Sequence, residues 1–141
     1  MKKDLLIYGI GNPGRQDDGL GYEFVCALDE SDNYHKHHNY QLNIEDAELI
    51  SRYKEVIFVD AGKNMTEVFE LNLITAKANV TFSTHGLNAE TLVHLCKEIY
   101  NKEPKCQLLS IKADHFSMNL GLSPQAQKHL QFALTSFNSS I

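Results

Sequence analysis

Three residues of metal-binding type follow apolar segments of this 141-residue chain. Asp18 follows a glycine-rich stretch, Asp60 ends the apolar run Glu55-Val-Ile-Phe-Val-Asp60, and His85 stands in Ser83-Thr-His-Gly86. Two carboxylates and one imidazole form an incomplete ligand set for a divalent transition metal, with positions open for substrate or water. Because the three residues are far apart in the sequence, a shared site depends on the fold.

The expected elements place these residues at one edge of a sheet. Strands are predicted by continuous or alternating apolar residues over 4–9, 40–44, 55–60, 68–74 and 107–111. Helices are predicted by apolar residues at helical spacing over 19–28, 46–53, 88–99 and 123–137, the last two beginning at the N-cap residues Asn88 and Ser123. This order predicts an α/β fold: a three-layer sandwich with a mostly parallel twisted sheet, helices on both faces, and 68–74 as an antiparallel exception. Sites in such sheets lie at the carboxyl ends of the strands.

Composition limits the classes of partner. The length favours a single domain spanning residues 1–141, and a formal net charge of −5 with no basic run beyond Lys2-Lys3 argues against nucleic-acid binding. No run approaches the roughly 18 apolar residues of a membrane span. Three scattered cysteines without a CxxC motif indicate free, mostly buried thiols in a reducing cytoplasm.

The glycines of the first loop allow a competing interpretation. Gly9, Gly11 and Gly14 match GxGxxG, a spacing that lets backbone amides approach a pyrophosphate. However, the Asp17-Asp18 pair would repel that anion, and Pro13 lacks an amide. A nucleotide-binding protein therefore remains only an alternative. Each candidate ligand also has a structural interpretation: Asp18 as a favourable acid in a first helical turn, Asp60 as a loop cap, and His85 as a helix cap.

Four segments resemble the hydrogenase maturation proteases. Gly9-Ile-Gly-Asn-Pro-Gly-Arg-Gln-Asp-Asp-Gly-Leu-Gly21 resembles the N-terminal signature of that family, and Val56-Ile-Phe-Val-Asp-Ala-Gly62 its second acidic motif. Ser83-Thr-His-Gly-Leu87 resembles its histidine motif, and Gly121-Leu-Ser-Pro124 the start of its final helix. The four segments occur in the order of the family and span most of the chain.

The resemblance implies an activity. Members are cytoplasmic endopeptidases with an α/β sandwich fold that remove a C-terminal peptide from the precursor of a [NiFe]-hydrogenase large subunit after nickel insertion. By position, Asp18, Asp60 and His85 match the catalytic metal-binding residues, and the nickel is expected to come with the precursor. Many relatives have Glu where this chain has Asp18, so the metal would lie closer to the loop or be bridged by water. Whether the metal polarises a carbonyl, activates water or orients the substrate stays open.

One segment departs from the family. Relatives usually carry a Gly-Gly-Thr type motif after the second strand, whereas Leu42-Asn-Ile-Glu-Asp-Ala-Glu-Leu49 lacks those glycines. The departure leaves the identity of the substrate open. It also motivates a second hypothesis, a non-cleaving protein that binds the metallated precursor or nickel itself.

Further polar residues could assist the site. Asp17 is a candidate for a group that supports the metal ligands, Asn12 for a brace of the first loop, and His115 for an approach to the same sheet edge. His35, His37 and His38 lie in the polar stretch 31–39, which predicts a solvated loop capable at most of adventitious metal binding.

Overall fold

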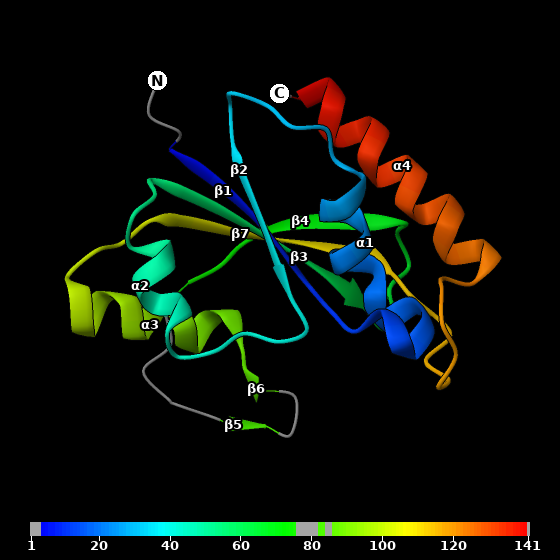
Figure 1. Cartoon of the computed structure of the whole chain (residues 1–141), viewed down its shortest axis with the longest axis horizontal. Coiled ribbons are helices and arrows are strands. Elements are labelled where there is room, and N and C mark those ends of the chain that lie inside the picture. Colours follow the sequence, from blue (N-terminus) through cyan, green and yellow to red (C-terminus); the bar gives the residue numbers. More distant parts are fainter. Residues whose placement is uncertain (1–3, 76–81, 84–85, 141) are drawn as a thin grey trace.

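A five-stranded sheet forms the centre of the computed structural model, which describes residues 4–75, 82–83 and 86–140. The strands are β1 (Leu5–Ile10), β2 (His35–Asn39), β3 (Glu55–Gly62), β4 (Phe69–Leu73) and β7 (Lys105–Lys112). Their spatial order is β2-β1-β3-β7-β4 (Figure 1), with every neighbouring pair parallel except the antiparallel β7 and β4. The mostly parallel sheet and its antiparallel exception are therefore confirmed.

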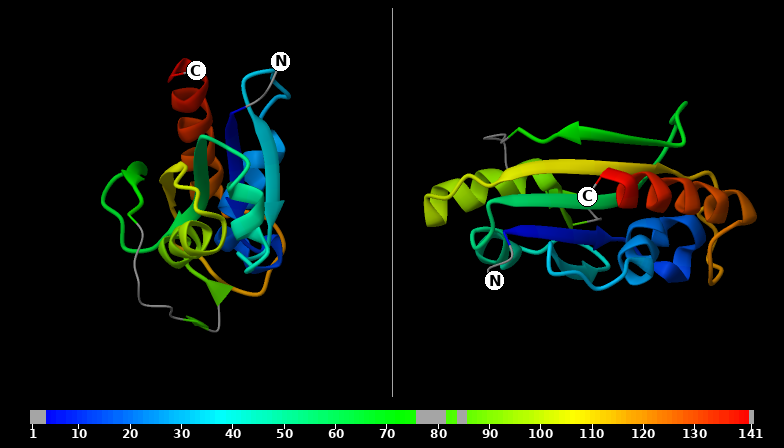
Figure 2. Two further views of the ribbon diagram at one scale, coloured as in Figure 1. Left: turned by 90° about the vertical axis from the view of Figure 1, so that its left-hand side faces the viewer. Right: turned by 90° about the horizontal axis from the view of Figure 1, so that it is seen from above.

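Helices cover both faces of the sheet (Figure 2). Helices α1 (Leu20–Ala27) and α4 (Pro124–Ser140) pack on one face, and α2 (Asp46–Ile50) and α3 (Ala89–Tyr100) pack on the other. Successive strand residues alternate between the two cores, so Ile7 faces α1 and α4 whereas Leu6 faces α2 and α3. Ile99, expected to be inward-facing, is exposed because the buried stripe of α3 ends one turn earlier, at Cys96.

The predicted N-caps are present. Asn88 Oδ1 accepts a hydrogen bond from the backbone amide of Thr91 at 2.7 Å, and Ser123 Oγ accepts one from Ala126 at 3.2 Å. Each satisfies an amide that the first helical turn leaves without a partner. Helix α4 runs three residues past its expected end at Phe137. No helix among the described residues is long and apolar enough to cross a membrane.

The second strand differs from its prediction. The expected strand over 40–44 is wrong, and the stretch 31–39 is not simply a loop, because β2 occupies His35–Asn39. Among the described residues this strand pairs with β1 alone and forms an edge of the sheet, so its side chains need not alternate between apolar and polar. The shift places Asn39 opposite Ile10, at the carboxyl end of β1.

Glycines allow β1, β3 and α1 to pack closely. A Cβ on Gly21 would lie 2.0 Å from the carbonyl oxygen of Val59, and a Cβ on Gly9 would lie 2.2 Å from that of Gly21. Gly9 and Gly21, the first and last residues of the segment that resembles the N-terminal signature, therefore allow the backbones to pack closely. Between β1 and α1, a short 3-10 segment, η1 (Pro13–Gly19), carries Asp17 and Asp18.

Candidate active site

Asp18 and Asp60 line the same cavity, which has a volume of about 700 Å³. The pairing of β1 with β3 ends at Gly9 and Val59, so Asp60 lies one residue beyond the last pair. At that level the chain leaves β1 and turns into η1, which carries Asp18. The sequence prediction that these two carboxylates converge at the carboxyl ends of the strands is therefore confirmed.

Asp60 is held in an environment that disfavours its charge. Burial raises the pKa of its carboxyl group to about 7, and the negative charge of Asp18 adds to the increase. A hydrogen bond from the backbone amide of Ala61 to Asp60 Oδ1, at 2.8 Å, acts in the opposite direction. Two carboxylates in one cavity repel each other, which is the situation that a bound cation relieves.

The backbone amides of the first loop donate hydrogen bonds to other groups of this chain. The backbone amide of Asn12 donates to Asp18 Oδ2 at 3.0 Å, that of Gly14 to Asn12 Oδ1 at 2.9 Å, and that of Gly11 to the carbonyl of Asn39 at 3.1 Å. Pro13 has no amide to offer. The amides that a pyrophosphate would need are thus used within the chain, which argues against the nucleotide interpretation. Asn12 is confirmed as a brace of the loop.

Asp17 points away from this cavity and ties the loop to a distant segment. Its carboxylate accepts hydrogen bonds from the amides of Asp114, His115 and Ser123, and from the Ser123 hydroxyl, at 2.9–3.2 Å. Burial alone would raise the pKa of Asp17, but these hydrogen bonds outweigh it and lower the pKa below its usual value. Asp17 therefore supports the site by holding η1 against the loop that follows β7.

The two histidines expected at this edge have different outcomes. His85 lies outside the described residues. His115 is exposed, and its side chain is not among those lining the cavity. Its carbonyl oxygen accepts a hydrogen bond from the Asp17 amide, and its own amide donates to the Asp17 carboxylate. Among the described residues, no group of three His, Cys, Asp or Glu side chains is arranged to hold a metal ion. Of the three predicted metal-binding residues, the structure thus places Asp18 and Asp60 in one cavity.

The cavity wall includes residues that the sequence did not indicate. They come from the end of β2 and the segment after it, from the turn after β3 and from the loop after β7: Asn39, Tyr40, Gln41, Asn43, Lys63 and Phe116. The first four lie at or just beyond the carboxyl end of a parallel strand, so a correct placement of β2 would have identified them. Hydrogen bonds anchor the segment after β2 to the sheet. The buried Asp46 carboxylate accepts one from Tyr8 Oη at 2.7 Å and one from the Asn43 amide at 2.9 Å.

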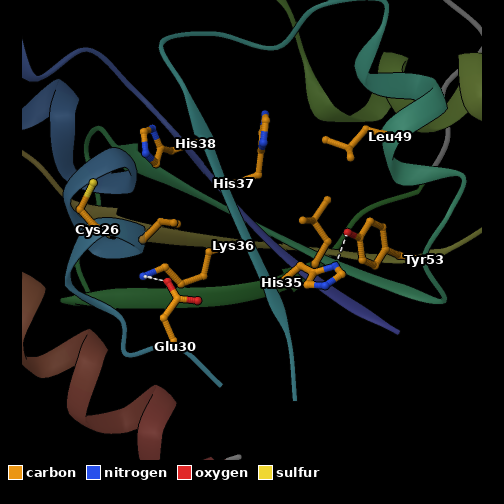
Figure 3. Close-up of a pocket in the computed structure, with 10 residues that line it drawn as sticks. Cys26, Glu30, His35, Lys36, His37, His38, Leu49 and Tyr53 are labelled. Carbon is orange, nitrogen blue, oxygen red and sulfur yellow. Dashed lines mark hydrogen bonds and ion pairs between the residues drawn. The ribbon is translucent and has the colours of Figure 1, made fainter. Parts of the chain in front are cut away.

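The histidines of β2 line a separate pocket of about 500 Å³ (Figure 3). His35 Nδ1 lies 2.6 Å from Tyr53 Oη, His37 packs edge-on against Tyr8, and His38 contacts the ring of Tyr22. Each imidazole has its own partner, and the strand directs neighbouring side chains to opposite faces. The stretch expected to be a solvated loop therefore contains a strand whose histidines each contact an aromatic ring.

Several solved structures with the same fold are named as hydrogenase maturation proteases or peptidases. The hydrogenase maturating endopeptidase HybD from E. coli superposes with a TM-score of 0.78 at 17% identity, covering 96% of this chain and 90% of that one. The [NiFe] hydrogenase maturation protease HycI from Thermococcus kodakarensis gives a TM-score of 0.72 at 21% identity, with the same coverages. A hydrogenase 2 maturation peptidase from a Thaumarchaeota archaeon gives 0.68 at 18%, covering 98% and 97%. The chain has the fold of the hydrogenase maturation proteases.

The likeness to the hydrogenase maturation proteases extends over nearly the whole length of each compared chain. No protein-family model and no curated protein matches the sequence. The resemblance noted from four short motifs thus agrees with the fold. Identities of 17–21% leave the activity to be argued from the site.

Proposed function

We propose that this chain is an endopeptidase that removes the C-terminal peptide from a nickel-loaded [NiFe]-hydrogenase large-subunit precursor. The observation that carries the proposal is the convergence of Asp18 and Asp60 on one cavity at the carboxyl ends of β1 and β3. The proteins named above as hydrogenase maturation endopeptidases and proteases share this fold. A cavity of about 700 Å³ is within the usual range for ligand sites and is open to a polypeptide segment.

Nickel belongs to the substrate in this proposal. It arrives bound to the precursor, and Asp18 and Asp60 contribute oxygen ligands that complete its coordination. A divalent cation between the two carboxylates would offset their mutual repulsion. The buried thiols of this chain do not take part, because Cys96 of α3 and Cys106 of β7 lie in the core between that face of the sheet and helices α2 and α3.

His85 is the third proposed ligand. This role is supported by Leu87, two residues beyond His85, which pairs with Leu42 in an isolated bridge. Gln41 and Asn43, on either side of Leu42, line the cavity. The short strand β6 (Gly86–Leu87), which follows His85, is thus joined to the cavity wall. Removing the imidazole by His85→Ala is expected to abolish processing.

Binding of the metal would position the peptide bond to be cleaved. A substrate held by its metal ion and by the cavity wall reacts as if intramolecular, which lowers the entropic part of the barrier. When bound, the metal would supply Lewis-acid chemistry, by polarising the scissile carbonyl or lowering the pKa of an attacking water, or would only orient the substrate. Asp18 and Asp60 act by fixing where that metal lies relative to the cavity wall.

The segment after β2 is proposed to select the precursor. Together with Asn39 at the end of β2, it lines the cavity through Tyr40, Gln41 and Asn43, and it continues into the stretch that departs from the family motif. A ligand that leaves the polar side chains of a site without hydrogen-bond partners binds more weakly. This chain is therefore expected to process its own cognate precursor in preference to those of other maturation proteases.

The test is the intact mass of a large-subunit precursor from the same genome, incubated with the protein with and without prior nickel loading. Loss of a C-terminal peptide from the nickel-loaded precursor alone is the expected result. Stable binding without loss of mass would instead identify a non-cleaving binder. Cleavage of the nickel-free precursor at the same rate would contradict the proposed role of the metal.

A further inference from the structure

The loop 113–123, between β7 and α4, carries two apolar side chains that are largely exposed to solvent. Met118 is 80% exposed and Leu120 is 88% exposed, the two highest values among the described large apolar side chains. They are two residues apart at the outer part of one loop. Apolar side chains gathered on a protein surface mark sites of interaction with another macromolecule.

Hydrogen bonds hold this loop in a fixed shape. The amide of Gln16 donates to the carbonyl of Asn119 at 2.9 Å, and Ser117 Oγ donates to Gln16 Oε1 at 2.5 Å. The Asp17 carboxylate binds both ends of the loop, at Asp114 and Ser123. Figure 1 shows the loop in yellow and orange beside the blue η1. A loop that is ordered beforehand loses little conformational entropy when a partner binds.

The backbone is strained where it holds the loop. Gln16 has φ 48° and ψ −115°, a conformation that side-chain-bearing residues rarely adopt. Both its amide and its side chain bind the loop that carries Met118 and Leu120. Strain of this kind persists where the surrounding structure determines it, and it concentrates at functional sites.

The same loop forms part of the cavity wall. Phe116 lines the cavity together with Asp18 and Asp60, and Lys63 Nζ lies 4.6 Å from the centre of its ring. Arg15, the residue before Gln16, also lines the cavity. The exposed apolar residues therefore begin two positions beyond a wall residue. A polypeptide whose tail enters the cavity beside Phe116 would lie against this loop.

We propose that Met118 and Leu120 dock the folded body of the polypeptide substrate, through an apolar patch beside the tail that enters the cavity. This docking site rests on the proposed function and adds to it a surface outside the cavity. The substrate is favoured over a second copy of this chain, because the loop is continuous with the cavity wall.

The experiment compares Met118→Glu/Leu120→Glu with the matched variant Phe132→Glu, which changes a 63% exposed side chain on α4. Steady-state cleavage of the nickel-loaded large-subunit precursor gives KM and kcat, and binding to the same proteins carrying Asp60→Asn gives Kd. The double variant is expected to raise KM and Kd about tenfold or more and to leave kcat within about twofold. Phe132→Glu is expected to leave all three unchanged.

Each outcome separates docking from the proposed function. If the wild type cleaves the precursor and the double variant has the same KM and Kd, the docking proposal is wrong and the proposed function stands. If the wild type neither binds nor cleaves, the proposed function is wrong and docking falls with it. A dimer in sedimentation that the double variant dissociates, with KM unchanged, would assign the loop to self-association and overturn the proposal. Thermal melting confirms that both variants are folded.

Discussion

Asp17 and Asp18 are neighbours in the sequence with opposite surroundings. Asp17 is 1% exposed, and its two oxygens accept four hydrogen bonds from three residues about 100 positions away. Asp18 accepts a hydrogen bond from the amide of Asn12 and lines the cavity with Asp60. A carboxylate surrounded by the chain's own donors stabilises the fold. One with acceptor capacity left over, facing a second carboxylate, is available to a cation.

The largest effect is expected at Asp60. Asp60→Asn removes a proposed metal ligand, and processing of the nickel-loaded precursor is expected to fall at least about a hundredfold, since metal catalysis contributes several kcal/mol. Stability is expected to stay the same or rise, because the neutral amide is buried at lower cost and no longer repels Asp18. Mass spectrometry and thermal melting of the same preparation measure the two effects. A large loss of stability would instead make Asp60 a structural residue like Asp17.

The reverse pattern is expected at Asp17. Asp17→Asn faces an amide NH₂ toward the donors of Asp114, His115 or Ser123, which is expected to lower the free energy of unfolding by about 2–3 kcal/mol. Denaturant titration at pH 7 measures this difference. Wild-type stability at pH 7 would show that these hydrogen bonds contribute nothing.

The same substitution has a pH dependence with a defined sign. The folded-state pKa of Asp17 is lowered, so its carboxylate stabilises the fold at pH values above the unfolded-state pKa of about 4. That stabilisation is lost as the pH falls through the lower folded-state pKa. The difference in unfolding free energy between wild type and Asp17→Asn is therefore expected to shrink below about pH 4, as followed by denaturant titration. A difference that grows on acidification would contradict the lowered pKa.

A smaller effect is expected at Gly21, whose lack of a side chain lets α1 pack closely against β1 and β3. Gly21→Ala places a methyl group 2.0 Å from the carbonyl oxygen of Val59 and 2.4 Å from that of Ile10, so α1 has to shift. We expect a destabilisation of about 1–3 kcal/mol, together with slower processing because Val59 precedes Asp60. Gly14→Ala is the matched control, since its new methyl group would meet only Asn12 Oδ1 at 3.1 Å. Equal melting temperatures for the two variants would refute the close packing.

The smallest effect is expected at Asn12, whose backbone amide donates to Asp18 and whose side chain accepts from the Gly14 amide. Asn12→Ala removes the acceptor for the Gly14 amide but keeps the backbone amide that binds Asp18. The free energy of unfolding is expected to fall by about 1 kcal/mol, and processing by no more than a few-fold. Thermal melting and the processing rate measure these changes. A loss of processing as large as that of Asp60→Asn would mean that the side chain itself contacts the substrate.

The sequence predicted features that depend on local pattern. Continuous apolar runs identified β1, β3 and β7, and their parallel order placed Asp18 and Asp60 at one end of the sheet. Asn88 and Ser123 were recognisable as N-caps because their partners lie three residues away. The convergence of the two carboxylates followed from topology alone.

Features that depend on long-range contacts were not predictable. β2 carries the polar sequence His35–Asn39, and only its pairing with β1 makes it a strand. Misplacing it concealed the cavity residues that follow it, Tyr40 and Gln41 among them. The role of Asp17 depends on amides about 100 residues away, and nothing in its local sequence distinguishes it from Asp18.

The most direct measurement compares Asp17→Asn with Asp18→Asn in one assay. The two variants make the same chemical change at adjacent positions, and the nickel-loaded precursor is followed by intact mass at a temperature where both are folded. The account predicts that Asp17→Asn still removes the C-terminal peptide and that Asp18→Asn does not. Cleavage by Asp18→Asn at the wild-type rate would contradict the assignment of Asp18 and Asp60 as the metal-binding pair.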